Sequence, residues 1–144
     1  MVKKAEKSDL ESAVNLALAF WESSSVNELT DEFIDTFADN ESEIFLKTEN
    51  GTPIGFAQCS LRHDYVEGTE SSPVGYLEGI YIKDKFRNKG YAKELLRACE
   101  EWAKNKGCSE FASDCELDNA NSLLFHKAVN FTEANRIICF TKKL

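Results

Sequence analysis

A short cationic loop contains residues suited to one kind of chemistry, the binding of phosphate groups. Arg87-Asn88-Lys89-Gly90-Tyr91-Ala92 joins the strand-like run 77–82 to a segment whose apolar residues recur with helical spacing. At the N-terminus of a helix, backbone N–H groups lack partners and the helix dipole adds positive potential. The loop therefore predicts a site for a phosphorylated cofactor. The alternative is a basic loop that only caps the helix with solvated charge.

The composition indicates one globular domain, residues 1–144. This length allows a hydrophobic core, and 42% hydrophobic with 29% charged residues is ordinary for a soluble protein. No apolar run approaches the roughly 18 residues that a membrane span needs. The charged N-terminus also lacks the apolar region of a signal peptide. We expect a cytoplasmic protein without a membrane partner.

An excess of acidic residues constrains the partners. The net charge is −8 and the sequence pI is about 4.8, which disfavours nucleic acid because no basic face is available to neutralise its phosphates. The same charge suits a cationic small-molecule substrate, although acidity can also serve solubility alone. The five cysteines are scattered and form no C-x-x-C pair, so we expect mostly buried thiols and no metal site.

Hydrophobic periodicity and turn residues predict the order of elements. Asn50-Gly51 is typical of a tight turn between two strands. The expected order is an α/β domain with a mixed sheet and helices on both faces. We expect strands at 2–5, 43–48, 54–63, 74–82 and 110–115, helices at 10–21, 27–38, 89–105 and 119–129, and one or two final strands within 131–141.

Two sequence blocks resemble the GCN5-related N-acetyltransferase (GNAT) superfamily, and the resemblance extends over essentially the whole chain. Arg87-x-x-Gly90-x-Ala92 matches the Q/R-x-x-G-x-G/A signature, and residues 119–131 have the asparagine and closing phenylalanine of a second block in register. His126 and Asn130 stand where the family usually has tyrosine and glycine. The resemblance implies an α+β fold with a mixed, mostly antiparallel sheet of about six to seven strands and about four helices.

A narrower resemblance is to aminoglycoside 6'-N-acetyltransferases of the small, single-domain, dimeric subclass. The strings 65–81 and 110–114 carry this resemblance. It implies a homodimer, and direct transfer of an acetyl group from acetyl-CoA to the 6'-amino group of an aminoglycoside in a ternary complex. The alternatives are transfer to another amine, such as a polyamine or a protein amine, and a non-catalytic module that binds acyl-CoA.

The family resemblance implies which residues bind the cofactor. Backbone groups of 80–82 would pair with the pantetheine arm of acetyl-CoA, and the loop N–H groups would hold its pyrophosphate. Asn119 would bond the pantetheine chain, but it is also typical of a helix start. The cofactor-binding residues that we expect are Ile80, Tyr81, Ile82, Arg87, Asn88, Lys89, Gly90, Tyr91, Ala92, Lys93 and Asn119.

Glu78 is the expected catalytic residue, because a lone carboxylate in an apolar strand can bind an ammonium group or take its proton. Strand alternation places Glu78 on one face with Tyr76 and Ile80. The adjacent Gly79 fits a β-bulge that would redirect the side chain. The alternative is a solvent-facing glutamate on an edge strand. His126 would donate a proton to the departing CoA thiolate, or it would only close its helix against the cofactor.

Four further residues are expected to bind the amine substrate, through the narrower resemblance. Asp114 ends a strand at the edge where α/β sites gather, and its alternative is turn chemistry. Trp21 and Tyr65 would line the substrate site, and their alternative is core packing. Asn135 stands where relatives can carry an acidic substrate contact, so the affinity for one amine is expected to be weaker.

Overall fold

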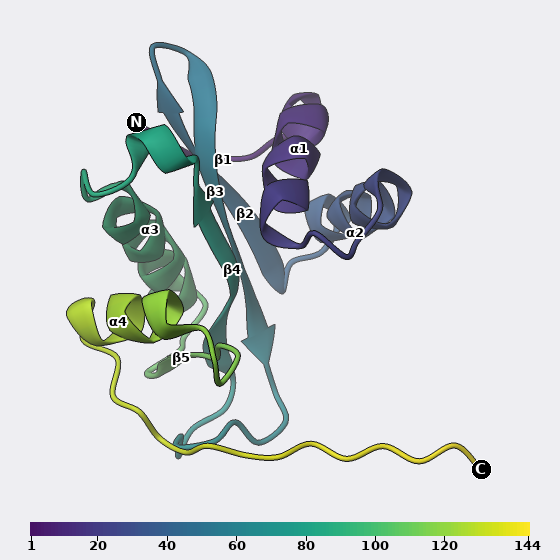
Figure 1. Ribbon diagram of the computed structural model, residues 1–144, viewed down its shortest axis with the longest axis vertical. Coiled ribbons are helices and arrows are strands. Elements are labelled where there is room, and N and C mark those ends of the chain that lie inside the picture. The colour runs from purple at the N-terminus through teal and green to yellow at the C-terminus, as the bar shows by residue number, and fades with distance from the viewer.

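A five-stranded sheet runs through the centre of the molecule (Figure 1). The structure is a computed structural model that describes all 144 residues. The strands lie in sequence order, and every neighbouring pair is antiparallel except β4 and β5, which are parallel. The predicted mixed, mostly antiparallel sheet is therefore confirmed. The strands are β1 (Val2–Lys4), β2 (Ser42–Glu49), β3 (Thr52–Arg62), β4 (Val74–Ile82) and β5 (Phe111–Ser113).

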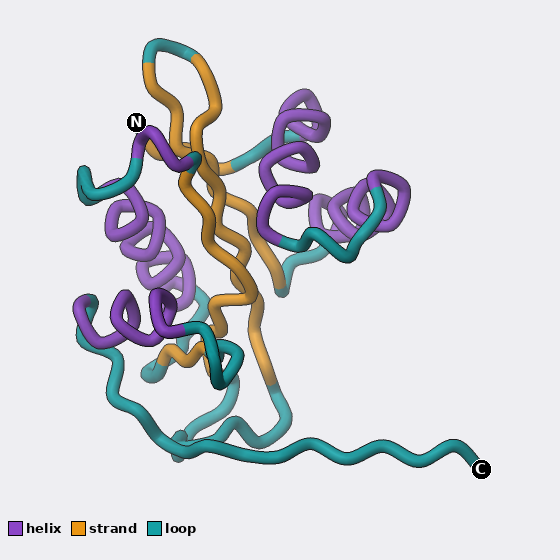
Figure 2. Tube along the Cα trace, viewed as in Figure 1, coloured by secondary structure: helices purple, strands orange, loops and turns teal.

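Four helices cover the two faces of the sheet, as the element order predicts. α1 and α2 lie against one face, and α3 and α4 lie on the other side (Figures 1 and 2). α3 makes the crossover connection that the parallel pair β4–β5 requires. None of the helices has the length and apolar composition that a membrane crossing needs. The helices are α1 (Leu10–Phe20), α2 (Val26–Ala38), α3 (Tyr91–Asn105) and α4 (Ala120–Ala128).

Two apolar clusters hold these layers together. Phe33 of α2 and Phe56 of β3 are fully buried between the sheet and the first two helices. Leu95 and Leu96 of α3 are buried against the opposite face. Burial of such side chains contributes about 1.5–3 kcal/mol each relative to exposure. The helices are thereby held on both faces of the sheet.

Only two of the five cysteines are buried. Cys59 and Cys99 both lie in the cluster under α3, and the neighbouring Cys99 thiol, together with burial, raises the pKa of the Cys59 thiol. A thiol held in its neutral form is unreactive. Cys115 and Cys139 are exposed, and Cys108 is half-buried. The expectation of mostly buried thiols is therefore wrong, because the two exposed residues lie outside the helices and strands that form the core.

Residues with positive φ lie at two boundaries close to their predicted positions, the turn between β2 and β3 and the start of α3. Asn50 and Gly51 both have positive φ in the two-residue turn between β2 and β3, which confirms the predicted hairpin. The helix expected at 89–105 begins at Tyr91, because Asn88 (φ 62°) and Gly90 (φ 82°) are in the left-handed region. A right-handed helix cannot include them. All four residues 87–90 of the cationic loop therefore lie outside the helix.

The residues after α4 form no strand, so the expected count of six to seven strands is wrong. Residues 131–144 run along the end of the sheet and then leave the body of the molecule (Figure 1). Ile137, Ile138 and Phe140 in this segment are 64%, 80% and 88% exposed. A strand forms only where a neighbouring edge takes its N–H and C=O groups. This segment is paired with no strand of its own chain.

Candidate functional site

A β-bulge in β4 positions Glu78. Gln58 of β3 pairs with Gly79 and Cys59 pairs with Leu77, so Glu78 is the extra residue between two paired positions. The predicted bulge is confirmed. The expectation that Ile80 shares the face of Glu78 is wrong, because one extra residue reverses the alternation beyond it. Ile80 packs instead in the cluster under α3.

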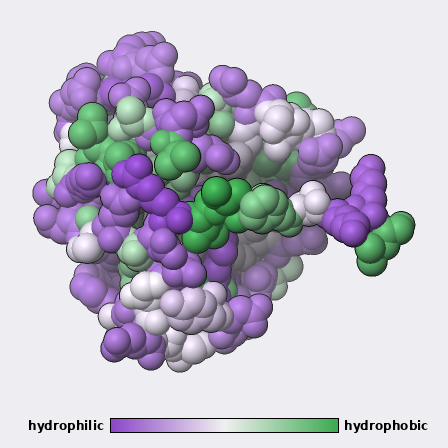
Figure 3. All heavy atoms as spheres, turned by 60° about the horizontal axis from the view of Figure 1, so that its bottom comes forward, coloured by the Kyte–Doolittle hydropathy of each residue, from purple (hydrophilic) through white to green (hydrophobic).

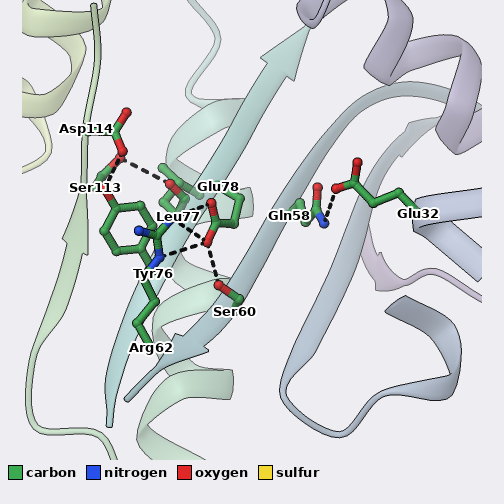
Figure 4. Close-up of polar contacts among 9 residues, drawn as sticks. All are labelled: Glu32, Gln58, Ser60, Arg62, Tyr76, Leu77, Glu78, Ser113 and Asp114. Carbon is green, nitrogen blue, oxygen red and sulfur yellow. Dashed lines mark hydrogen bonds and ion pairs between the residues drawn. The ribbon is translucent and has the colours of Figure 1, made fainter. Parts of the chain in front are cut away.

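The Glu78 carboxylate is held by two side chains from β3 (Figure 4). Ser60 Oγ donates to Glu78 Oε1 at 2.6 Å, and Arg62 donates to both carboxylate oxygens at 2.9–3.2 Å. Partial burial alone would lower the pKa of Arg62, but the hydrogen bonds to Glu78 outweigh it and raise that pKa. Oε1 accepts three of these bonds and Oε2 only one. Oε2 is therefore the oxygen with room for a further donor.

Asp114 joins the same group of side chains through Tyr76. The Arg62 guanidinium lies 3.5 Å from the centre of the Tyr76 ring, and the Tyr76 hydroxyl donates to Asp114 Oδ2. Burial, and then the bond to Asp114, raise the pKa of Tyr76. Asp114 follows β5, so its carboxylate accepts a bond across the sheet rather than from a local turn. The structure therefore brings Asp114 and Glu78 together through two intermediate side chains.

The Trp21 side chain packs beside the bulge in β4. It follows the last residue of α1, and its ring packs against Phe20 and Phe56 with centroids 5.0 and 5.6 Å apart. A Cβ atom on Gly79 would lie 2.7 Å from Trp21 Cζ2. Glycine at this position thus allows the indole to approach the strand next to Glu78. The core-packing interpretation of Trp21 is therefore confirmed, and its contact with the substrate stays a prediction.

The loop before α3 presents unpaired backbone donors. None of the N–H groups from Asn88 to Lys93 donates to a backbone acceptor. A Cβ atom on Gly90 would meet no atom within 4 Å, so space is open beside the helix start. Six free N–H groups at a helix N-terminus suit a pyrophosphate. A surface hollow of about 240 Å³ lies nearby, between α3 and α4, and Lys93 and Arg97 line it.

One edge of β4 is free next to this loop. β5 pairs only with Gly75–Leu77, so residues 78–82 have no strand partner on that side. An extended ligand chain can bond such an edge as an added strand does. The carbonyl of Ile82 is already occupied, because Arg87 Nε donates to it at 2.8 Å. Arg87 also pairs with Asp84 at 3.0 Å, so its charge is partly engaged within the chain.

Asn119 and His126 have structural roles in α4. Asn119 Oδ1 accepts from the Ser122 N–H at 3.0 Å, which confirms a helix cap. His126 Nδ1 lies 2.7 Å from the Ser122 carbonyl oxygen, which can only accept, so Nδ1 carries a proton. His126 Nε2 lies 2.8 Å from Ser113 Oγ, which ties α4 to β5. Their contacts with a cofactor and a leaving group stay predictions.

Tyr65 and Asn135 lie apart from the Glu78 group. Tyr65 is 75% exposed, so core packing is wrong for it. Asn135 donates to Glu67 at 3.3 Å on the surface. No contact within the chain joins either residue to Glu78. Their roles in substrate binding stay predictions.

Three site residues were missed by the sequence analysis. Ser60, Arg62 and Tyr76 hold Glu78 and Asp114, yet none was singled out. A signal was present, because Gln58, Ser60 and Arg62 are polar at alternate positions of an otherwise apolar strand. The structure contains no group of three acidic, histidine or cysteine side chains that could hold a metal ion.

Comparisons with known sequences give one family. A sequence model described as the acetyltransferase (GNAT) family matches residues 10–131. The aminoglycoside N(6')-acetyltransferase type 1 of Serratia marcescens is 37% identical over 145 residues, which cover 100% of this chain and 99% of that protein. The protein of the same name from Salmonella typhimurium is 46% identical over 99 residues, 69% of this chain and 68% of that protein.

Solved structures agree over the whole chain. The structure of AAC(6')-Iy in complex with the bisubstrate analogue CoA-S-monomethyl-acetylneamine matches with a TM-score of 0.97 at 35% identity, and covers 100% of this chain and 98% of that one. The apo structure of the aminoglycoside antibiotic 6'-N-acetyltransferase AAC(6')-IG from Acinetobacter haemolyticus has a TM-score of 0.95 at 36% identity, over 100% and 99% of the two chains.

Proposed function

Because the chain belongs to the acetyltransferase (GNAT) family, we propose that it transfers an acetyl group from acetyl-CoA to the 6'-amino group of an aminoglycoside. One observation carries the choice of acceptor. The Glu78 carboxylate stands at a bulge beside the free edge of β4, with Oε2 open to another donor. A carboxylate at this point suits a cationic amine and a reaction at its nitrogen.

Acetyl-CoA fits the free edge and the loop. The free backbone groups of Glu78 to Tyr81 would bond the pantetheine arm, and the N–H groups of Asn88 to Lys93 would hold the pyrophosphate. Lys89 and Lys93 add positive charge beside these groups.

The acceptor amine binds beside the same residues of β4 as acetyl-CoA, but on the opposite side of the strand. Its ammonium group pairs with Glu78 Oε2, and Asp114 and Trp21 border the same space. After a proton passes to Glu78 or to a water beside it, the nitrogen attacks the thioester carbonyl carbon. The C–N bond forms, the C–S bond breaks, and the second proton that the nitrogen loses passes to the CoA sulfur, so that CoA leaves as the thiol. The free N–H groups of β4 stabilise the oxyanion, and most of the rate arises from holding the two reactants together.

The decisive experiment replaces the carboxylate of Glu78 by an amide. Glu78→Gln removes the charge that binds and activates the amine, so we expect kcat/KM with kanamycin-type acceptors to fall about a hundredfold in a thiol-release assay. NMR of the product identifies the acetylated nitrogen. Glu101→Gln, at an exposed surface residue of α3, is the matched control. Unchanged turnover by Glu78→Gln would remove Glu78 from the mechanism, and acetylation at another nitrogen would contradict the assigned acceptor.

The C-terminal segment supports a homodimer. Apolar side chains are exposed along the segment that leaves the body, among them Ile138 and Phe140 (Figure 3). Exposed apolar side chains in a row mark an interaction surface, and the occupant that we propose is a second copy. Phe140→Asp would then lower the mass measured by light scattering toward that of one chain. An unchanged mass would assign the interface to another surface.

The proposed compartment is the cytoplasm. All five cysteines are free, as is usual where thiols are kept reduced. Acetyl-CoA is a cytoplasmic metabolite in this proposal, so the enzyme and its donor share a compartment. Localisation of a tagged chain by fractionation tests this placement.

A further inference from the structure

One buried polar atom lies beside the acceptor site without a partner. Gln58 is only 5% exposed, and its side-chain oxygen Oε1 has no hydrogen-bond partner, while its nitrogen Nε2 donates to Glu32 Oε1 at 3.3 Å. The charge of Glu32 sets this orientation, because the reverse orientation would bring two oxygens together. Buried acceptors in folded proteins almost always have a partner. An unpaired one therefore points to a ligand group that is absent from the chain alone.

Glu32 brings an unpaired negative charge to the same point. It lies on α2, and its side chain and that of Gln58 point toward one another between the helix and β3 (Figure 4). α2 has four acidic residues and no basic ones, and Glu32 takes part in no ion pair. The negative charge next to the orphan oxygen is therefore not neutralised within the chain.

Gln58 lies one strand repeat along β3 from Ser60, which bonds Glu78. Gln58 and Ser60 are two residues apart on the same face of β3, and Ser60 bonds Glu78. Two residues along a strand span about 6.6–7 Å. Gln58 is also directly opposite Gly79, the residue against which Trp21 packs. Glu32 and Gln58 thus adjoin the acceptor site on the side of α1 and α2.

We propose that Glu32 and Gln58 form a second subsite, which binds another ammonium group of the acceptor while Glu78 binds the reacting one. The ammonium would receive the charge of Glu32 and a hydrogen bond from its own N–H to Gln58 Oε1. This subsite rests on the proposed function and narrows its substrate class to amines that carry a second cationic group. It predicts that acceptors with one amine bind more weakly.

The test compares two acceptors across matched variants of the full chain. Glu32→Gln removes the charge at an exposed position, and Asp31→Asn makes the same charge change on the neighbouring residue of α2, which has no contact with Gln58. The acceptors are kanamycin, which has several amines, and 6-amino-6-deoxyglucose, which has one. We expect Glu32→Gln to raise the KM for kanamycin about tenfold, with kcat, the KM for acetyl-CoA and the KM for the monoamine unchanged. Asp31→Asn should leave all four values within about twofold.

A second variant tests the neutral half of the subsite. Gln58→Leu keeps the size of the side chain and removes both polar groups, so it should also raise the KM for kanamycin alone. Equal effects of Glu32→Gln and Asp31→Asn would overturn the subsite, because general charge would then explain both. An equal loss with both acceptors would overturn it as well. If the wild-type chain acetylates neither acceptor, the proposed function itself fails, which is a separate outcome.

Discussion

The proposed cofactor loop and the proposed acceptor site differ in how they are assembled. The loop is a continuous stretch, Arg87 to Ala92. Its free backbone N–H groups need no distant residue to position them. The acceptor site combines side chains from β3, β4 and the residue after β5, with a wall from α1. Backbone donors at a helix start require only a local turn. A cluster of charged side chains requires that strands distant in sequence pair in one register.

The two regions also differ in how strongly their parts depend on one another. In the acceptor site, Arg62 touches both Glu78 and Tyr76, and Tyr76 holds Asp114. In the loop, each N–H group from Asn88 to Ala92 is free and acts by itself. Substitutions in the loop should therefore have separate effects, whereas a substitution in the acceptor site should reach several groups at once.

The largest expected effect tests the loop. Gly90→Asp puts a negative charge where the pyrophosphate is proposed to bind, at a position whose φ of 82° favours glycine. We expect acetyl-CoA binding measured by calorimetry to weaken about a hundredfold. Gly90→Asn is the control, because asparagine tolerates left-handed φ and brings no charge. Tight acetyl-CoA binding by Gly90→Asp would contradict the assignment of the loop.

An intermediate effect tests the dependence within the acceptor site. Arg62→Gln leaves Glu78 with only Ser60 to orient it, so we expect kcat to fall about tenfold while the KM for acetyl-CoA stays the same. Arg62→Lys keeps the charge but not the two-pronged contact, and should recover only part of the loss. If Arg62 merely offsets charge, Arg62→Gln would instead lower the KM for the amine and leave kcat unchanged.

The smallest effect tests the independence of the loop. Tyr91 opens α3, and its hydroxyl donates to Glu49 Oε1 at 2.8 Å, a bond that raises the pKa of Tyr91. Tyr91→Phe removes one tether of the helix start and none of the N–H groups, so the KM for acetyl-CoA should rise only about two- to fivefold. Glu49→Gln keeps an acceptor for the hydroxyl and should change less. A loss of kcat in Tyr91→Phe would show that the loop depends on its neighbours after all.

Most of the fold could be predicted from the sequence because its signals are local. The bounds of β4 match the prediction at 74–82, and the Asn50-Gly51 turn lies where the dipeptide indicates. The C-terminal strands were predicted wrongly. The β-branched and aromatic residues of 137–140 indicate a preference for extended structure, but they do not indicate whether a neighbouring strand is available. A strand forms only when a second segment pairs with it, and residues 137–140 pair with no other segment of the chain.

The acceptor site shows the limit of sequence reasoning at a single residue. Glu78 and the bulge beside it could be predicted, because a carboxylate and a glycine in an apolar strand are both unusual. The prediction that Glu78 and Ile80 share a face of the sheet was wrong, since the alternation of side chains reverses after the extra residue. Arg62 and Tyr76 could be found only after the register was known, because their contact with Glu78 and Asp114 crosses from strand to strand.

By itself, the sequence determined the order of elements, the cationic loop before α3 and the presence of an acid in β4. These depend on periodicity, turn residues and residue type within a few positions of one another. Only the tertiary structure decided that Ser60 and Arg62 hold that acid, that Oε2 is its open oxygen, and that Gln58 and Glu32 stand beside it. The reason is that hydrogen bonds between side chains require a distance of about 3 Å, and strand register and helix packing set such distances across the chain.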